Sequence, residues 1–260
     1  MNPMLQSIAC GIVVCSLPGL SLAAQTDGLK PSSASQTPAP ATQPGTTAAV
    51  QTAAIGADWQ SLFDGESLKG WKITDFAGRG EVLVKRVESS KKDTNAPAGK
   101  SILLEAGAIM TGVSWTNEVP KMNYEIRLDA MKVDGSDFFC GLTFPVNDSH
   151  CSFIIGGWGG GLVGISSLDG MDASENETTK FMGFERGRWY HIRVRVTPRK
   201  LEAWIDEEKL VNVDTQGKKI SVRPGDIEMS VPFGVAAYQT AAALREIEWR
   251  RLESAKPAAK

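Results

Sequence analysis

Apolar and polar residues alternate along most of the chain from residue 58 onward. From Tyr124 to Ala130 every second side chain is apolar and the residues between them are mostly charged, and segments 190–196 and 201–205 repeat the pattern. Successive side chains of a strand point to opposite faces, so this alternation predicts strands with one buried face. Further strands are predicted at residues 81–87, 100–105, 162–167, 233–238 and 243–252.

Turn-forming residues separate these strands, and helical patterns are nearly absent. Glycine, proline and aspartate mark turns at residues 78–80, 134–135, 197–198 and 223–226. Only segments 66–70 and 241–246 resemble helices, and both patterns are weak. Many antiparallel strands with few short helices predict an all-β domain, in which two antiparallel sheets pack as a sandwich or jelly roll.

The composition before residue 58 differs from that of the rest of the chain. Residues 8–22 are apolar and small, too few to reach the ~20 that span a bilayer, and Ala23 and Ala24 suit a signal peptidase. We therefore interpret residues 1–24 as a signal peptide. Residues 25–57 are rich in Thr, Ala, Gln, Ser and Pro, and they predict a disordered linker because they cannot bury enough apolar surface to order the chain.

These assignments leave a β-sandwich domain at residues 58–253 and a tail at residues 254–260. The protein is predicted to be exported, to the periplasm or the cell exterior, and association with the cell envelope is left open. No later segment is a plausible membrane helix. The net charge is −2 and positive residues are mixed with negative ones, so nucleic-acid binding is not expected. The oligomeric state is left open.

Two of the four cysteines, Cys140 and Cys151, lie in the predicted domain. Each falls on the apolar face of a strand pattern, Cys140 together with Phe138 and Phe144. A turn at residues 145–148 would join the two strands as a hairpin and set the cysteines diagonally. An exported protein can form a disulfide, but the diagonal placement leaves two buried free thiols as an equal alternative.

The segment 62–71 reads Leu-Phe-Asp-Gly-Glu-Ser-Leu-Lys-Gly-Trp. Asp64 and Gly65 suit a turn around which Phe63 and Trp71 bury their side chains. This segment resembles the signature that opens the 3-keto-disaccharide hydrolase family. The closing segment 244–252 and the segments 188–194 and 203–206 also look like parts of that family.

The resemblance implies a concanavalin A-like β-sandwich that cleaves glycosides whose sugar carries a 3-keto group. Such a keto group acidifies a neighbouring C–H bond. An enzyme of this kind therefore needs a base together with an acid or a metal, rather than a strong nucleophile.

A glycine-rich loop at residues 156–161 carries Trp158. The stretch 159–164 matches G-x-G-x-x-G, but a strand pattern follows it instead of a helix, so a dinucleotide site is not expected. The Trp158 ring could stack on a sugar, or it could pack down against the protein. Trp158 is therefore a candidate substrate-binding residue.

Residues 169–179 gather four carboxylates in a turn-rich stretch. Two carboxylates with separated pKa values are what glycoside hydrolysis usually requires, so Asp172, Glu175 and Glu177 are candidate catalytic acids and bases. Their oxygens could instead ligate a divalent cation such as calcium, although EF-hand spacing is absent. A solvated acidic loop would need neither role. No other cofactor is expected.

His150 and His191 are the only imidazoles. His150, near Asp148 at the predicted hairpin turn, is a further catalytic candidate, as a proton shuttle or a single metal ligand. The two histidines lack the spacing of zinc ligands, so no metal site is assigned.

Two more residues are candidates for substrate binding. Asp137 opens the strand pattern 137–144, which corresponds to a middle strand of the resembled family through Gly141. Arg193 lies on the charged strand face that also carries Glu125 and Arg127. If that face is concave, it is a polar floor for a sugar; otherwise it is a salt-bridged solvent face.

Two functions fit these observations. The first is an exported glycoside hydrolase or lyase that acts on 3-keto-disaccharides or related oligosaccharides. The second is a non-catalytic carbohydrate-binding or adhesion sandwich that uses Trp158. Carbohydrate is the expected partner in both.

Overall fold

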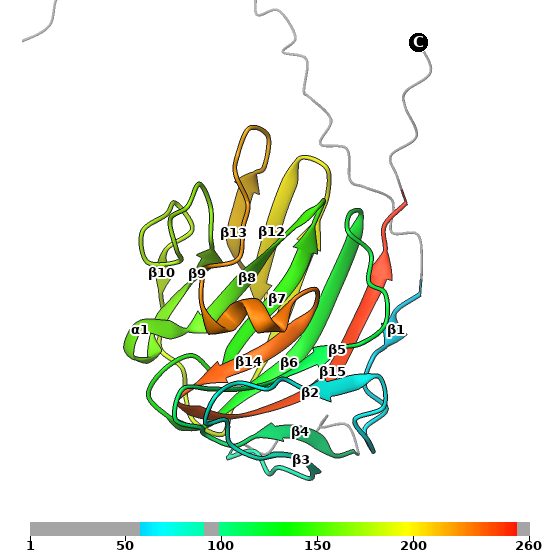
Figure 1. Cartoon of the computed structure of the whole chain (residues 1–260), viewed down its shortest axis with the longest axis vertical. Coiled ribbons are helices and arrows are strands. Elements are labelled where there is room, and N and C mark those ends of the chain that lie inside the picture. The colour runs from blue at the N-terminus through cyan, green and yellow to red at the C-terminus, as the bar shows by residue number, and fades with distance from the viewer. Residues whose placement is uncertain (1–57, 91–98, 254–260) are drawn as a thin grey trace, which may run out of the picture. The chain divides into compact units, whose positions relative to one another are not determined.

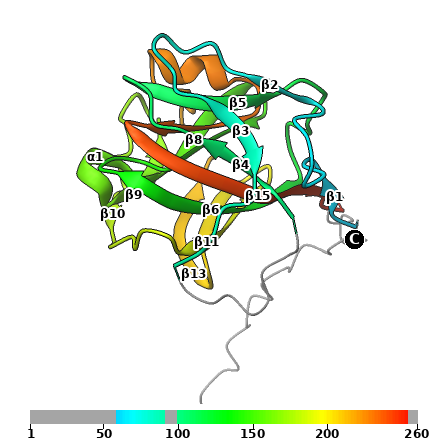
Figure 2. The same ribbon diagram turned by 90° about the horizontal axis from the view of Figure 1, so that it is seen from below.

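The computed structural model describes residues 58–90 and 99–253. In this part of the chain two antiparallel sheets lie face to face (Figures 1 and 2), which confirms the predicted all-β sandwich. The predicted signal peptide (1–24), linker (25–57) and tail (254–260) lie outside the described residues. None of the described helices is long and apolar enough to cross a membrane.

Sheet 1 has the strand order β13-β12-β11-β6-β15-β4-β3, and β1 pairs with β15. Its strands are β1 (Gln60–Ser61), β3 (Val82–Lys85), β4 (Ser101–Leu104), β6 (Tyr124–Gly135), β11 (Trp189–Val196), β12 (Lys200–Ile205), β13 (Glu208–Asp214) and β15 (Thr240–Arg251).

Sheet 2 has the order β10-β9-β8-β7-β14-β5-β2. Its strands are β2 (Trp71–Ile73), β5 (Met110–Trp115), β7 (Cys140–Val146), β8 (Ser149–Gly156), β9 (Leu162–Ser166), β10 (Lys180–Phe181) and β14 (Gly234–Tyr238). The described helices are the single turn α1 (Gly157–Gly160) and the 3₁₀ helix η1 (Asp226–Ser230).

The main hydrophobic core fills the space between the inward faces of the two sheets. Tyr124, Ile126 and Leu128 of β6 contribute to it from sheet 1, and Leu142 and Phe153 contribute from sheet 2. All five are at most 1% exposed. The alternating pattern of the sequence therefore places the apolar side chains on the buried faces, whose removal from water is the main driving force for folding.

Phe138 departs from the predicted arrangement. It was expected beside Cys140 on the inward face, but β7 begins only at Cys140, and Phe138 packs with Ile154 and Leu162 in a separate cluster. Phe139 joins the main core instead, because the chain has not yet entered the regular alternation of the strand. Neither weak helical pattern forms a helix, and segment 241–246 belongs to β15.

The opening motif forms a structural corner. Asp64 Oδ1 accepts hydrogen bonds from the backbone amides of Glu66 (2.8 Å) and Ser67 (2.7 Å), and these bonds lower the pKa of the Asp64 carboxyl group. Gly65 has a φ of +74°, which glycine adopts without strain. Trp71 Nε1 donates to the Leu62 carbonyl over 2.7 Å, which ties the two ends of the motif together.

The two cysteines of the domain are free and buried. Strands β7 and β8 form a hairpin in which Cys140 pairs with Ile155 and Cys151 pairs with Phe144. Cys151 therefore lies four residues before the position opposite Cys140. Strand geometry puts this separation at about 13 Å along the strand, far beyond the reach of a disulfide.

The outer face of sheet 2, which is turned away from sheet 1, is partly covered by two segments. Residues 167–179 lie over β9, where Thr178 Oγ1 accepts a hydrogen bond from the Ile165 amide over 2.8 Å. The helix η1 lies in front of the sheet in Figure 1 and contacts β5 and β14. A hollow remains between these covers.

Candidate functional site

The hollow is a cavity of about 230 Å³ on the outer face of sheet 2. Its lining combines side chains of β8 and β9 with residues from the glycine-rich loop, from η1 and from the segment before η1. Among the lining residues are Ser152, Ile154, Ser166, Trp158, Arg223 and Tyr238. The cavity is the place where the glycine-rich loop predicted from the sequence meets the sheet.

Trp158 stands at the rim of this cavity. The residue has a φ of +48° within the single turn α1, and Gly156 and Gly159 beside it have φ values of +81° and +86°. Glycine tolerates this left-handed backbone, so the loop can turn sharply and present the indole outward. Trp158 is 42% exposed, and the Arg223 guanidinium lies 5.7 Å from its ring centroid. The Trp158 side chain is therefore only partly covered by the protein.

Asp137 connects the same loop to the sheet. Its Oδ1 accepts a hydrogen bond from the Phe138 amide (2.8 Å), and its Oδ2 accepts one from the Gly159 amide (3.1 Å). Asp137 and Trp158, both proposed from the sequence as substrate-binding residues, thus line one cavity. The carboxylate keeps lone pairs that can accept hydrogen bonds from a ligand.

Sequence reasoning did not single out two lining residues, Arg223 and Tyr238. Arg223 was read only as part of a turn, and Tyr238 only as the end of a strand. Tyr238 stacks on Phe138 at a centroid distance of 5.7 Å, and together with Met110 they give the cavity an apolar side. No local signal reveals these residues, because chain segments far apart in sequence bring them together.

The acidic segment lies beside the cavity, and only part of it approaches the lining. Asp172 Oδ2 is 3.6 Å from Arg223 Nε, so this carboxylate reaches the cavity through a lining residue. Glu177 pairs with Lys218 at 3.0 Å, and Glu175 is exposed. Neither glutamate is among the lining residues.

A buried asparagine organises that segment. Asn176 Nδ2 donates to the carbonyl oxygens of Ile165 and Asp172, each over 2.7 Å. Its Oδ1 accepts a hydrogen bond from the Thr178 amide over 2.9 Å. The segment is therefore a hydrogen-bonded cover on sheet 2, and it fixes where each carboxylate points.

His150 shares the outer face of β8 with Ser152 and Ile154 but does not line the cavity. Burial lowers the pKa of the His150 imidazole, and the nearby Lys121 ammonium lowers it further. Within residues 58–90 and 99–253, no group of three His, Cys, Asp or Glu side chains is arranged to hold a metal ion.

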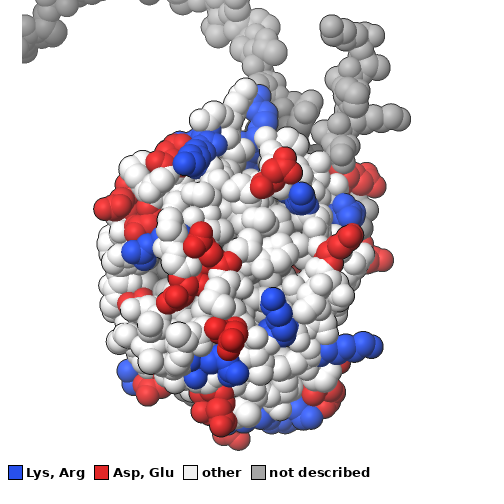
Figure 3. Space-filling model, viewed as in Figure 1, with Lys and Arg blue, Asp and Glu red and all other residues white. Residues whose placement is uncertain are grey.

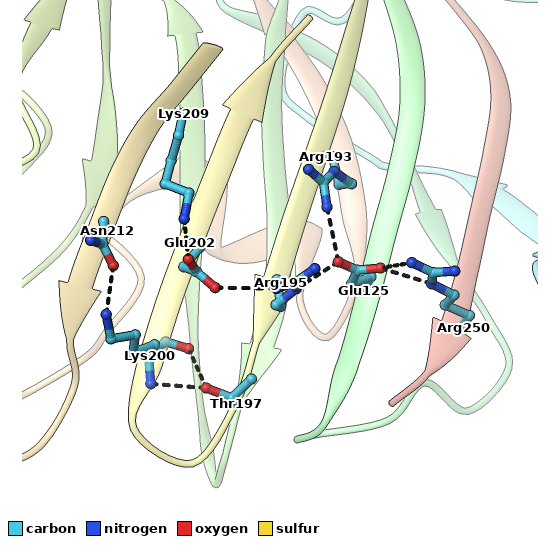
Figure 4. Close-up of polar contacts among 9 residues, drawn as sticks. All are labelled: Glu125, Arg193, Arg195, Thr197, Lys200, Glu202, Lys209, Asn212 and Arg250. Carbon is cyan, nitrogen blue, oxygen red and sulfur yellow. Dashed lines mark hydrogen bonds and ion pairs between the residues drawn. The ribbon is translucent and has the colours of Figure 1, made fainter. Parts of the chain in front are cut away.

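Arg193 lies on the outer face of the other sheet. Its guanidinium stacks over the Trp204 ring at 3.9 Å, and its Nη1 donates to Glu125 Oε1 over 3.1 Å. Glu125 also accepts hydrogen bonds from Arg195 and Arg250, and Figure 4 shows its carboxylate at the centre of these three guanidinium groups. The predicted substrate-binding residue Arg193 is thus separated from Asp137 and Trp158 by the whole thickness of the sandwich.

The buried Glu125 carboxylate stays ionised. Its side chain has no exposed surface, and burial alone would raise its pKa. Hydrogen bonds from Arg250 and Arg195 outweigh burial and lower the pKa below its usual value. This outer face of sheet 1 is salt-bridged, and it also carries a hollow of about 580 Å³ that Arg193 lines, so it has a feature of each of the two interpretations of the sequence.

Charges are also mixed on the face that carries the cavity. Figure 3 shows Lys and Arg interspersed with Asp and Glu over the side of the molecule seen in Figure 1. A ligand of this cavity would therefore meet aromatic and hydrogen-bonding groups more than a field of one sign.

Comparison with curated proteins finds no match. Among solved structures, a glycosyl hydrolase candidate from Parabacteroides distasonis is 12% identical with a TM-score of 0.46, covering 75% of this chain and 94% of that one. A domain of an extracellular arabinanase from Geobacillus stearothermophilus, in complex with arabinotriose, is 11% identical with a TM-score of 0.42, covering 71% and 84%. A carbohydrate-binding module from Bacillus subtilis is 11% identical with a TM-score of 0.41, covering 68% and 93%.

These TM-scores are all below 0.5, so we conclude nothing about function from the solved structures. The family comparison is more informative. A family model described as a 3-keto-alpha-glucoside-1,2-lyase-like domain matches residues 58–253, which confirms the resemblance seen in segment 62–71. Because the match covers most of the chain, this protein belongs to the family of 3-keto-alpha-glucoside-1,2-lyase-like domains.

Proposed function

We propose that this protein is an exported carbohydrate-active enzyme that cleaves 3-keto-disaccharides or related oligosaccharides at the cavity of sheet 2. One observation carries the proposal: the cavity joins the exposed indole of Trp158 to a carboxylate, a guanidinium and a phenol. Membership of a lyase-like family supports the same reaction class. Residues 1–24 would direct the export.

The lining supplies the groups that elimination at a 3-keto sugar requires. Asp137 would remove the proton from the carbon next to the keto group. The electron pair of that C–H bond then forms a C=C bond as the glycosidic C–O bond breaks. Arg223 would stabilise the negative charge that develops on the keto oxygen, and Tyr238 would donate the proton that the leaving oxygen needs. Addition of water to the unsaturated product would complete a net hydrolysis.

Aromatic stacking would hold the sugar during this step. The apolar face of a pyranose ring fits against an indole, and Trp158 offers that face at the cavity rim. Polar groups at the floor and the opposite side would fix the orientation of the ring, as in most small-molecule sites.

A non-catalytic carbohydrate-binding function is the second candidate. Both oxygens of Asp137 already accept a backbone hydrogen bond, so part of the lone-pair capacity of this carboxylate is already taken. The sequence-based acid and base candidates Glu175 and Glu177 do not line the cavity. These two observations favour binding without turnover, and an activity assay separates the two functions.

The test uses the full chain with 3-keto-trehalose and a 3-keto-glucoside, and it measures release of free sugar. Wild type should release sugar, and Asp137→Asn should lower kcat by at least about a hundredfold if Asp137 is the general base. The double variant Glu175→Gln, Glu177→Gln tests the alternative acid–base pair. Loss of turnover in the double variant but not in Asp137→Asn would move the chemistry to the acidic segment. Sugar binding without any turnover by wild type would establish the binding function instead.

A further inference from the structure

Two serines face each other on the floor of the cavity and differ in their hydrogen bonding. Ser152 of β8 and Ser166 of β9 are direct cross-strand partners, and both line the cavity. Ser152 Oγ shares a hydrogen bond of 2.8 Å with Thr143 Oγ1. Ser166 Oγ is buried and has no partner within the described part of the chain.

An unpaired buried hydroxyl group is unfavourable for the folded protein. Ser166 is 2% exposed, so its hydroxyl has lost most of its contact with bulk water without gaining a protein partner. Leaving such a group unsatisfied costs free energy, and buried polar groups in folded proteins are nearly always paired. An unpaired hydroxyl group in a residue that lines a cavity is explained if its partner is a ligand.

The position of Ser166 in its strand supports this reading. Val163 and Ile165 of β9 point into the main core, so the alternation turns Ser166 to the outer face, toward the cavity. Two other buried side-chain atoms of the described residues lack a partner, Trp115 Nε1 and Ser230 Oγ. Neither of these residues lines the cavity.

We propose that Ser166 determines ligand specificity: its hydroxyl group hydrogen-bonds one oxygen of a single sugar ring seated in the cavity. The inference rests on the proposed function, because it assumes that the ligand is a sugar. Trp158 at the rim stacks on the face of the ring, and Ser166 at the floor reads one ring oxygen, hydroxyl or keto group.

The size of the cavity sets the length of ligand that it holds. Its volume of about 230 Å³ lies below the roughly 300–1,000 Å³ of pockets for drug-sized ligands. One ring therefore enters, and a second sugar unit stays outside the cavity. The protein should recognise one terminal unit of its substrate rather than an internal stretch of a chain.

The experiment measures the Kd of full-length wild type, Ser166→Ala and Ser230→Ala for four probes. The probes are methyl α-glucoside, methyl 3-keto-α-glucoside, trehalose and 3-keto-trehalose; KM and kcat are measured as well for any probe that is cleaved. Ser230→Ala is the matched control, because it removes a buried unpaired hydroxyl group that lies outside the lining. Comparison of 3-keto probes with their parent glucosides shows whether the oxygen that is read is the keto group.

Ser166→Ala should weaken binding of the one-ring probes roughly five- to tenfold, the effect of one lost hydrogen bond. Ser230→Ala should leave the Kd unchanged. Trehalose-based probes should bind within about threefold of the one-ring probes, because the second unit gains little contact. The melting temperature of Ser166→Ala should equal or exceed that of wild type, which shows that the loss is not a folding defect.

Three results would each contradict a different part of this inference. If sugars bind but Ser166→Ala matches wild type or Ser230→Ala, the role of Ser166 is wrong and the proposed function stands. If two-ring probes bind more than tenfold tighter than one-ring probes, the single-ring site is wrong. If none of the four probes binds wild type, the proposed function fails, and the inference fails with it.

Discussion

The Asp137 carboxylate accepts a hydrogen bond from the Gly159 amide and thereby fastens the Trp158 loop to the start of β7. The same carboxylate accepts from the Phe138 amide, so both oxygens face an N–H donor. A single side chain at the cavity thus both lines the site and holds its aromatic rim in place.

Asp137→Asn should loosen this loop. The asparagine amide can offer one acceptor oxygen, and its NH₂ group would then face the second backbone N–H donor. We expect faster hydrogen exchange at residues 157–161, with an opening free energy lower by about 1–2 kcal/mol. Unchanged exchange in this segment would show that Asp137 does not restrain the loop.

Trp158→Ala should weaken sugar binding with little change in the stability of the fold. The indole is 42% exposed, so its removal should shift the free energy of unfolding by less than about 1 kcal/mol. Sugar affinity should fall about tenfold, because the stacking surface is lost, and intrinsic fluorescence should no longer respond to sugar.

Phe181→Ala is the matched control for Trp158→Ala. Phe181 is 75% exposed and does not line the cavity. The Phe181→Ala substitution removes an exposed aromatic ring and leaves the proposed site unchanged. Equal losses of affinity in the two variants would contradict a specific role for Trp158.

Glu125→Gln should destabilise the sandwich strongly. The buried carboxylate is hydrogen-bonded to Arg193, Arg195 and Arg250, and the substitution removes a negative charge that all three guanidinium groups share, although Arg195 keeps Glu202 at 3.7 Å. We expect a loss of about 3–5 kcal/mol in the free energy of unfolding, measured by urea denaturation at pH 7.

Glu66→Gln provides the comparison. Glu66 pairs with Lys100 at 2.6 Å on the surface, where both side chains remain substantially exposed. A surface pair of this kind contributes at most about 1 kcal/mol. Similar losses for Glu66→Gln and Glu125→Gln would contradict the role that we assign to the buried network.

The pKa values of the two histidines should be shifted in opposite directions from the usual histidine value. A hydrogen bond between His191 Nδ1 and Asp129 Oδ1, 2.5 Å apart, raises the pKa of His191. Burial lowers this pKa, the negative charges of Asp129 and Asp206 raise it, and the positive charge of Arg245 lowers it. Burial and Lys121 lower the pKa of His150. Chemical shifts of the two imidazoles across pH 4–9 should therefore give a higher pKa for His191 than for His150.

The signs for stability follow from these directions. The protonated His191–Asp129 pair stabilises the fold fully below the unfolded histidine pKa of about 6.5, and this contribution is lost as pH rises through the higher folded value. For His150 the folded state resists protonation, so stability falls as pH drops below about 6.5. The free energy of unfolding is measured against pH for wild type, His191→Gln and His150→Gln. The difference between wild type and His191→Gln should change with pH above about 6.5, and the difference between wild type and His150→Gln should change below about 6.5.

The sequence was sufficient to predict the layers of the fold. Period-2 alternation in β6, β11 and β12 decides which side chains are buried, because burial of one face is what stabilises each strand. The prediction that Phe138 shares the inward face with Cys140 was wrong, because the alternation of inward and outward side chains is interrupted just before Cys140. Beyond such an interruption, the alternation no longer predicts which face a side chain occupies.

The candidate site could be predicted only in part. Trp158 and Asp137 stand out locally, one by its glycine-rich surroundings and the other by its place before a strand. Arg223 and Tyr238 do not, because packing of distant segments over sheet 2 brings them to the cavity. Arg193 was proposed for the same site, but strand parity fixes only which face of a sheet a side chain occupies. Parity does not say which sheet a strand joins, and Arg193 lines a separate hollow of about 580 Å³ on the outer face of sheet 1.

The register of the β7–β8 hairpin has a consequence for how this protein matures. Since Cys140 and Cys151 are held too far apart to be cross-linked, formation of the described sandwich needs neither an oxidant nor an isomerase that shuffles bridges. The sandwich should consequently form equally well in the presence of dithiothreitol.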